Sequence, residues 1–198
     1  MKPFDVLRDV YLAAIPVLGI LWVMDVPLHL GITLLGPTYL CLIAGVATAG
    51  GFLLKPYGGQ AGPFEALLGV AAVAAWLWAA WNFDDWLLDL ANRGPEKWIP
   101  GAIAIALAVE AMRRNCGVAI GILVGVFLIY GFFGDLLPGA FEAVPVRPRK
   151  LVIYLYTDEN AIPGLVLRVG ATMVLAFIIM GRLMEVSGAS SFFTDTAL

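Results

Sequence analysis

Two long apolar runs joined by a short basic hinge constrain this chain more than any other feature. The first run, residues 98–112, carries one charge, Glu110, and the second, residues 118–133, carries none. The hinge between them reads Arg113-Arg114-Asn115-Cys116-Gly117. A helix needs about 20 mostly apolar residues to cross a bilayer core of about 30 Å, and each run with its polar ends approaches that length. The pattern predicts two membrane helices that turn back on each other, with the paired arginines on the cytoplasmic side.

The composition indicates a membrane environment for the whole chain. The 198 residues are 61% hydrophobic and 14% charged, and the mean hydropathy is +0.91. Soluble domains contain about 25% charged residues, and a soluble chain of this size could not keep so much apolar surface out of water. The basic residues are scattered, which argues against a nucleic-acid partner. We therefore predict an all-α integral membrane protein.

Few residues of the kinds that bind metals or perform catalysis occur in this sequence. The chain has one histidine, His29, so it cannot contain a two-histidine haem site or an HExxH zinc motif. Its two cysteines, Cys41 and Cys116, lie far apart beside apolar runs, and we expect both to be free, buried thiols. No nucleophile elbow, phosphate loop or metal-ligand cluster is present. We expect no enzyme activity, no metal and no cofactor.

Hydropathy and helix-breaking residues predict about six transmembrane helices and two short interfacial helices. The segment 55–63 contains Pro56, Pro63 and several glycines, and it separates two of the spans. The N-terminus lacks the features of a cleaved signal peptide, so the first span is expected to be retained. The expected spans are residues 10–24, 32–54, 63–81, 98–112, 118–133 and 162–184, and the expected interfacial helices are residues 82–97 and 150–156.

Charge and aromatic placement predict a cytoplasmic N-terminus. Counted over six spans, the lysines and arginines divide evenly between the two sides, so the positive-inside rule gives a tie. The hinge with Arg113 and Arg114 is the tightest loop, and we use it to break the tie. In that topology four tryptophans gather at the outer interface, where amphipathic rings anchor membrane proteins: Trp22, Trp81, Trp86 and Trp98.

Three glycines recur every four residues along the run that follows the hinge. Gly117, Gly121 and Gly125 would share one helix face and permit another helix to approach closely. A fixed helix-packing seam is the favoured interpretation, and ordinary glycine usage in membrane helices is the alternative.

Two sets of charges within the apolar runs are candidates for a structural or functional role. Glu110 precedes Arg113 and Arg114 by three and four residues, within reach across one helical turn. A structural ion pair is favoured over a proton relay, because the same span holds no second acid. Arg168 lies about two turns into the last span. It could extend outward to water, pair with Asp158 or Glu159, or face a polar cavity.

Five segments of the chain resemble a known transporter family over residues 110–193. These are Glu110–Gly117, Phe127–Gly134, Leu137–Gly139, Leu155–Gly164 and Phe177–Phe193. They are similar to the fused permeases of tripartite ATP-independent periplasmic (TRAP) transporters, in the subgroup served by TAXI-type binding proteins. Before residue 110 only the hydropathy and the placement of loops match. The shared segments are packing and turn motifs.

The resemblance implies how the chain is divided and what it works with. Residues 1–112 would form a Q-type four-helix membrane domain and residues 113–148 a linking helix and loop. Residues 149–198 would hold an interfacial helix and the first helix of an M-type domain that is truncated or split. In this family a periplasmic binding protein delivers an organic anion, and sodium drives its uptake. The loops that hold substrate and sodium have no counterpart here, so the resemblance assigns neither site to this chain.

The sequence thus predicts the scaffold portion of a TRAP-type permease in a bacterial or archaeal cytoplasmic membrane. Its expected partners are an M-type transport domain, a periplasmic binding protein and the lipid bilayer. The alternatives are a small membrane anchor or adaptor subunit without transport activity, and the anchor of a membrane enzyme.

Overall fold

The computed structural model describes residues 3–57, 62–88, 94–136, 142 and 146–189, and for residues 3–7 and 136 it describes the backbone alone. Helices and turns account for this part of the chain, with no strand in it, so the all-α prediction is confirmed. A short 3₁₀ turn (η1, Gly134–Leu136) follows α6, and a π-helical turn (η3, Gly170–Val174) joins α8 to α9. The helices are α1 (Pro3–Val23), α2 (Val26–His29), α3 (Gly36–Leu54), α4 (Pro63–Leu88), α5 (Pro95–Cys116), α6 (Val118–Phe133), α7 (Pro148–Thr157), α8 (Leu165–Val169) and α9 (Leu175–Val186).

Proline and glycine set most of the helix ends. Proline occupies the first turn of α3, α4, α5 and α7, where its missing N–H costs no intrahelical hydrogen bond. Between α5 and α6, Gly117 has a φ of +97°, a left-handed conformation that a residue with a side chain rarely adopts. The chain therefore reverses at this glycine, as the predicted hinge requires.

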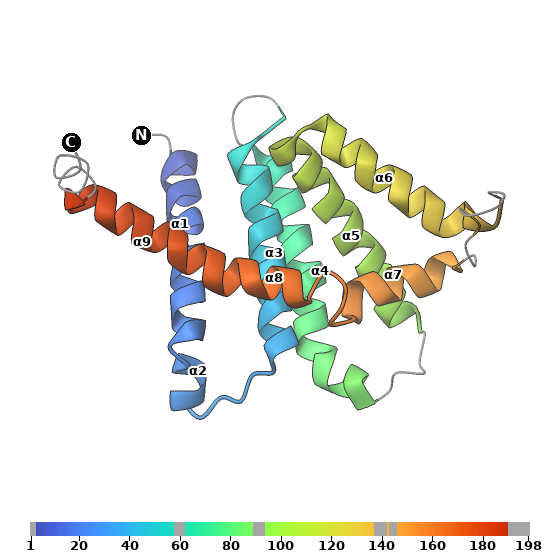
Figure 1. Ribbon diagram of the computed structural model, residues 1–198, viewed down its shortest axis with the longest axis horizontal. Coiled ribbons are helices and arrows are strands. Elements are labelled where there is room, and N and C mark those ends of the chain that lie inside the picture. Colours follow the sequence, from blue (N-terminus) through green and yellow to red (C-terminus); the bar gives the residue numbers. More distant parts are fainter. Residues whose placement is uncertain (1–2, 58–61, 89–93, 137–141, 143–145, 190–198) are drawn as a thin grey trace.

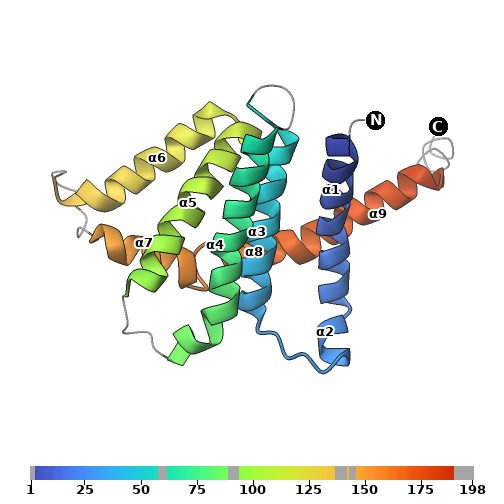
Figure 2. The ribbon, with the colours of Figure 1, turned by 180° about the vertical axis from the view of Figure 1, so that it is seen from behind.

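Helices α3, α4 and α5 lie side by side and form the centre of the molecule (Figures 1 and 2). Small residues permit their close approach. A Cβ placed on Gly45 of α3 would lie 2.9 Å from Trp76 Cβ of α4, and one on Gly69 of α4 would lie 3.4 Å from Ala49 Cβ of α3. Tight contact of this kind substitutes for the hydrophobic effect between helices in a membrane.

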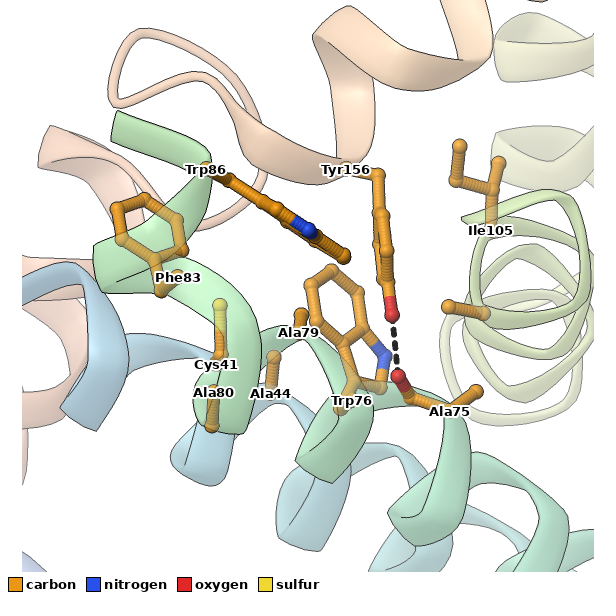
Figure 3. Packing of buried hydrophobic residues seen from close by; sticks show 11 residues of the cluster. Cys41, Ala44, Ala75, Trp76, Ala79, Ala80, Phe83, Trp86, Ile105 and Tyr156 are labelled. Carbon is orange, nitrogen blue, oxygen red and sulfur yellow. Dashed lines mark hydrogen bonds between the residues drawn. The ribbon is translucent and has the colours of Figure 1, made fainter. Parts of the chain in front are cut away.

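A buried aromatic cluster joins the segment after the linker to this bundle (Figure 3). Tyr156 of α7 is fully buried, and its hydroxyl donates a hydrogen bond to the carbonyl of Ala75 in α4. Its ring centroid lies 5.3 Å from that of Trp76 and 6.0 Å from that of Trp86. Gly101 of α5 permits the approach, because a Cβ there would lie 3.0 Å from Tyr156 Cγ. Residues 148–157 thus pack onto the bundle, whose helices α3 and α4 belong to the predicted Q-type domain.

Within the described ranges, three helices are long and apolar enough to cross a membrane, which is compatible with a membrane protein. They are α3, α4 and the continuous helix α8–η3–α9, which runs over Leu165–Val186. The predicted number of about six spans is not confirmed. Helix α6 has 16 residues, hence about 24 Å of length, short of the about 30 Å of a bilayer core. Helix α5 is continuous, but charged residues near both of its ends shorten its apolar part.

Several helix boundaries differ from those predicted. The interfacial helix expected at residues 82–97 does not begin separately, since α4 continues without a break to Leu88. Residues 82–88 contain neither glycine nor proline, and Asn82 Nδ2 donates a hydrogen bond to the Trp78 carbonyl one turn earlier. Residues 89–93 of the expected helix lie outside the described residues. The second expected short helix, at residues 150–156, is found as α7. Residues 32–35 were expected within a span, but they precede α3, which begins at Gly36.

The last apolar helix runs across the bundle instead of alongside it. Figure 1 shows α8 and α9 passing over α3 and α1 at a steep angle. At the crossing with α1, a Cβ on Gly19 would lie 2.1 Å from Leu175 Cδ2, so a larger residue would require the leucine side chain to shift. Among the described side chains of Leu165–Val186, Ala171 alone is buried. Most of the apolar surface of this helix therefore has no partner within the described chain.

Candidate functional site

A cluster of charged side chains lies at the end of the bundle where α5 meets α6. The Glu110 carboxylate accepts hydrogen bonds from Arg113 Nε at 2.7 Å, Arg113 Nη2 at 2.8 Å and Arg114 Nε at 2.7 Å. The helical spacing of three and four residues brings both guanidinium groups to the same carboxylate. The structure thus places these three side chains as the sequence pattern predicts.

Arg114 also connects α5 to the first turn of α4. Its Nη1 lies 4.0 Å from Glu65 Oε1, and the two side chains are 9% and 6% exposed. Backbone N–H groups hold the Glu65 carboxylate, that of Tyr57 at 3.1 Å and that of Gly62 at 3.3 Å. The guanidinium carbon stands 5.1 Å from the centre of the Phe52 ring. We call Glu65, Glu110, Arg113 and Arg114 the Arg114 cluster.

Asn115 and Lys55 extend this cluster toward α3. Asn115 Nδ2 donates hydrogen bonds to the carbonyls of Gly51 at 3.0 Å and Ala111 at 2.8 Å. Lys55 Nζ donates to the Asn115 carbonyl at 3.3 Å. Both carboxylates of the cluster are engaged by N–H donors, so the arrangement suits a fixed connection between helices better than proton transfer.

Sequence reasoning missed Glu65 and Asn115. Glu65 reads as one acidic residue in the first turn of a helix, where it complements the helix dipole. Its pairing with Arg114 depends on how α4 and α5 pack, which a linear pattern does not specify.

The three glycines of the predicted seam have different surroundings. A Cβ on Gly121 would lie 3.0 Å from Arg113 Cγ, so this glycine faces its own chain. A Cβ on Gly117 or Gly125 would meet no atom within 4 Å. Helix α6 has no buried residue among those described. The seam with a further helix stays a prediction, and its open position is Gly125.

The four tryptophans predicted as interface anchors lie at one end of the bundle, but they differ in exposure. That end holds the last turns of α1 and α4 and the start of α5 (Figure 1). Trp81 is 84% exposed, whereas Trp86 is buried against Tyr156. Trp22 stacks on Tyr39 with ring centroids 4.1 Å apart, and Arg149 lies over the Trp98 ring at 5.5 Å. Trp86 therefore contributes to internal packing.

Arg168 lies where two cavities adjoin. One, of about 350 Å³, is lined by Gly36, Glu159 and Pro163 among others, and the second, of about 320 Å³, by Trp22 and other residues. Arg168 and Gly36 line both. Arg168 is also exposed, so extension to water and a polar cavity both stay open among the alternatives that the sequence left. Asp158 instead accepts hydrogen bonds from Asn160, and no ion pair joins Arg168 to a carboxylate in the described residues.

The cysteines match the sequence prediction in part. Both are free, and Cys41 is buried in the aromatic cluster. Cys116 is exposed, contrary to expectation, because it ends α5 at the turn where the chain leaves the bundle. Within the described ranges, no three His, Cys, Asp or Glu side chains come together as a metal site would require.

The geometry thus offers two candidate sites: the Arg114 cluster, in which Glu110 is hydrogen-bonded to both arginines, and the open cavities at Arg168. Comparisons with protein-family models, with curated proteins and with solved structures find no match to this chain.

Proposed function

We propose that this chain is the scaffold portion of a TRAP-type secondary transporter that takes up an organic anion with sodium. In this proposal the chain resides in a bacterial or archaeal cytoplasmic membrane with its N-terminus in the cytoplasm. A periplasmic binding protein delivers the anion, and an M-type transport domain moves it. The substrate and sodium sites belong to that domain.

The observation that carries this proposal is the uncovered apolar surface of two helices that extend from a well-packed bundle. None of the described side chains of α6 is buried, and α8–η3–α9 buries Ala171 alone. Contiguous apolar surface of this extent is normally covered by lipid or by a protein partner. A transport domain seated against these helices would cover it.

The interior packing supports a static role. The aromatic cluster and the Arg114 cluster connect α3, α4 and α5 at different heights of the bundle. A scaffold must keep its shape while the attached domain moves, and helices fixed at several heights resist sliding. The resemblance over residues 110–193 supplies the identity of the moving partner, which packing alone does not.

Gly125 gives the sharpest test of the seam with an M-type domain. A Cβ there would meet no atom of the described chain within 4 Å, so this position can take a side chain without a clash at Cβ. We expect Gly125→Leu to abolish co-purification with a co-expressed M-type portion. Ala119→Leu is the matched control, since it adds the same kind of side chain to the same helix at an exposed position turned about 120° away from Gly125. Gly121→Leu should also impair assembly, but it disturbs the Arg113 side chain as well.

Sodium-dependent uptake decides between transport and the alternative of an adaptor subunit. The chain and the M-type portion are reconstituted together in proteoliposomes, and uptake of a labelled carboxylate is measured with a sodium gradient and with potassium in its place. The proposal expects uptake that needs sodium, the binding protein and this chain. Unchanged co-purification of both Gly125→Leu and Gly121→Leu, or uptake without this chain, would contradict it.

A further inference from the structure

An unpaired guanidinium stands at the junction of two cavities, and its chemistry indicates a ligand. Arg168 belongs to an apolar helix long enough to cross a membrane. Ionisable residues in such helices normally pair with another charge or face a polar cavity, and by default they mark functional sites. Arg168 lines both cavities, and its guanidinium makes no hydrogen bond or ion pair within the described parts of the chain. The partner of the Arg168 guanidinium is therefore expected outside the described parts of the chain.

The start of α3 provides space beside this guanidinium. A Cβ on Gly36 would lie only 3.1 Å from Arg168 Nη2, so the absence of a side chain permits this approach. Pro37 and Leu40 of the same helix line the larger cavity with Gly36.

Acidic residues restrict which ligand fits. Glu159 lines the larger cavity and Asp25 the smaller one, and neither pairs with Arg168. A purely anionic ligand would be repelled by these carboxylates, whereas a ligand with both charges could contact the guanidinium and a carboxylate at once. The larger cavity, of about 350 Å³, reaches the size of small-molecule sites, which is roughly 300–1,000 Å³.

We propose that these cavities bind a zwitterionic phosphate–amine group of the phosphoethanolamine type. The phosphate would lie on Arg168, whose planar guanidinium can donate two parallel hydrogen bonds to phosphate oxygens. The ammonium group would lie by Glu159. A soluble phosphoethanolamine and the headgroup of a phosphatidylethanolamine lipid offer the same chemistry. Trp22, which lines the smaller cavity and stacks on Tyr39, is a residue type enriched at headgroup depth. The site requires no transport partner and goes beyond the proposed function.

Native mass spectrometry of the purified full chain tests this proposal. The chain is equilibrated in detergent micelles that contain dioleoyl-phosphatidylethanolamine or, separately, dioleoyl-phosphatidylglycerol, which has phosphate but no amine. We expect the wild type to retain phosphatidylethanolamine preferentially. Arg168→Gln should weaken its retention about tenfold, the effect of losing one charge-assisted hydrogen-bonded pair. Glu159→Gln should abolish the preference for phosphatidylethanolamine while phosphatidylglycerol is still retained.

Two further arms complete the test. Arg182→Gln makes the same chemical change on the same helix, at an exposed arginine paired with Glu185, and should leave retention unchanged. Displacement of the lipid by millimolar O-phosphoethanolamine would identify a soluble ligand as the source, and persistence of the lipid would identify the headgroup. The proposal is overturned if Arg168→Gln retains phosphatidylethanolamine as the wild type does. It is also overturned if Arg182→Gln loses as much, or if Glu159→Gln keeps the preference.

Discussion

Truncating Tyr156 tests whether the segment after the linker is an integral part of the bundle. The side chain is fully buried, and its ring contacts Trp76 and Trp86 at centroid distances of 5.3 and 6.0 Å. Replacing a buried aromatic residue by alanine costs about 3–5 kcal/mol, including the cavity left behind. The two aromatic pairs contribute about 0.5–1.5 kcal/mol each to that loss. We therefore expect Tyr156→Ala to lower the free energy of unfolding by about 3–5 kcal/mol.

The hydroxyl contribution can be separated from that of the ring. Tyr156→Phe removes only the hydrogen bond to the Ala75 carbonyl. That carbonyl lies within α4, where it also accepts the N–H four residues later, so it is not left unpaired. We expect Tyr156→Phe to cost about 0.5–1.5 kcal/mol, the usual net value of one hydrogen bond. The losses of unfolding free energy in the two variants then separate the contribution of ring packing from that of the hydrogen bond.

Thiol labelling reports on the same cluster without unfolding the whole protein. Cys41 is fully buried beside Tyr156, whereas Cys116 is exposed and gives an internal reference for complete labelling. A maleimide should label Cys116 alone in the wild type and both thiols in Tyr156→Ala. Tyr154→Ala is the control, because this tyrosine lies in the same helix and is 44% exposed. Equal loss of stability in the two alanine variants, with Cys41 still protected, would refute the packing described here.

Two further substitutions test the interior contacts of the bundle. Arg114→Leu should cost about 2–3 kcal/mol in unfolding free energy, below the usual 3–5 for a broken buried pair, because Glu65 keeps its two backbone hydrogen bonds. It should cost more than Arg113→Leu, whose side chain is more exposed, and the reverse order would contradict the assignment. Gly45→Val should cost about 1–3 kcal/mol by forcing α3 away from α4, whereas Gly125→Val should be better tolerated, and unfolding of both in the same detergent compares them.

The existence and ends of most helices could be predicted from the sequence. Helix α6 begins and ends at the predicted residues, because Gly117 precedes it and the apolar run is continuous. The segment around Pro56 and Pro63 separates α3 from α4 as expected. These features depend on local chemistry, namely the conformational freedom of glycine and the missing N–H of proline.

What the sequence could not predict depends on contacts between distant segments. Tyr156 reads as one apolar position of a short amphipathic helix, and nothing near it indicates that its ring enters the space between α4 and α5. Trp86 has the composition of an interface anchor, yet burial against Tyr156 makes it part of the interior. The cavities at Arg168 arise because α8 passes the start of α3, more than a hundred residues earlier in the chain. Hydropathy gives the environment of a segment and not its direction.

The crosswise course of α8–η3–α9 affects how many helices can span a membrane, but not which residues lie at the two ends of the bundle. This helix has 22 residues and a length of about 33 Å, enough to cross a bilayer only if it stands nearly upright. Figure 1 shows it inclined across α3 and α1, so it cannot traverse the same depth as helices that stand along the bundle. The opposite placement of the basic hinge and the tryptophans does not depend on it. Helices α3, α4 and α5 alternate in direction, which puts Lys55, Arg113 and Arg114 at one end and the ends that carry Trp81 and Trp98 at the other. Lys97 and Arg149 lie over the Trp86 and Trp98 rings at the tryptophan end, so the basic residues alone do not orient the bundle.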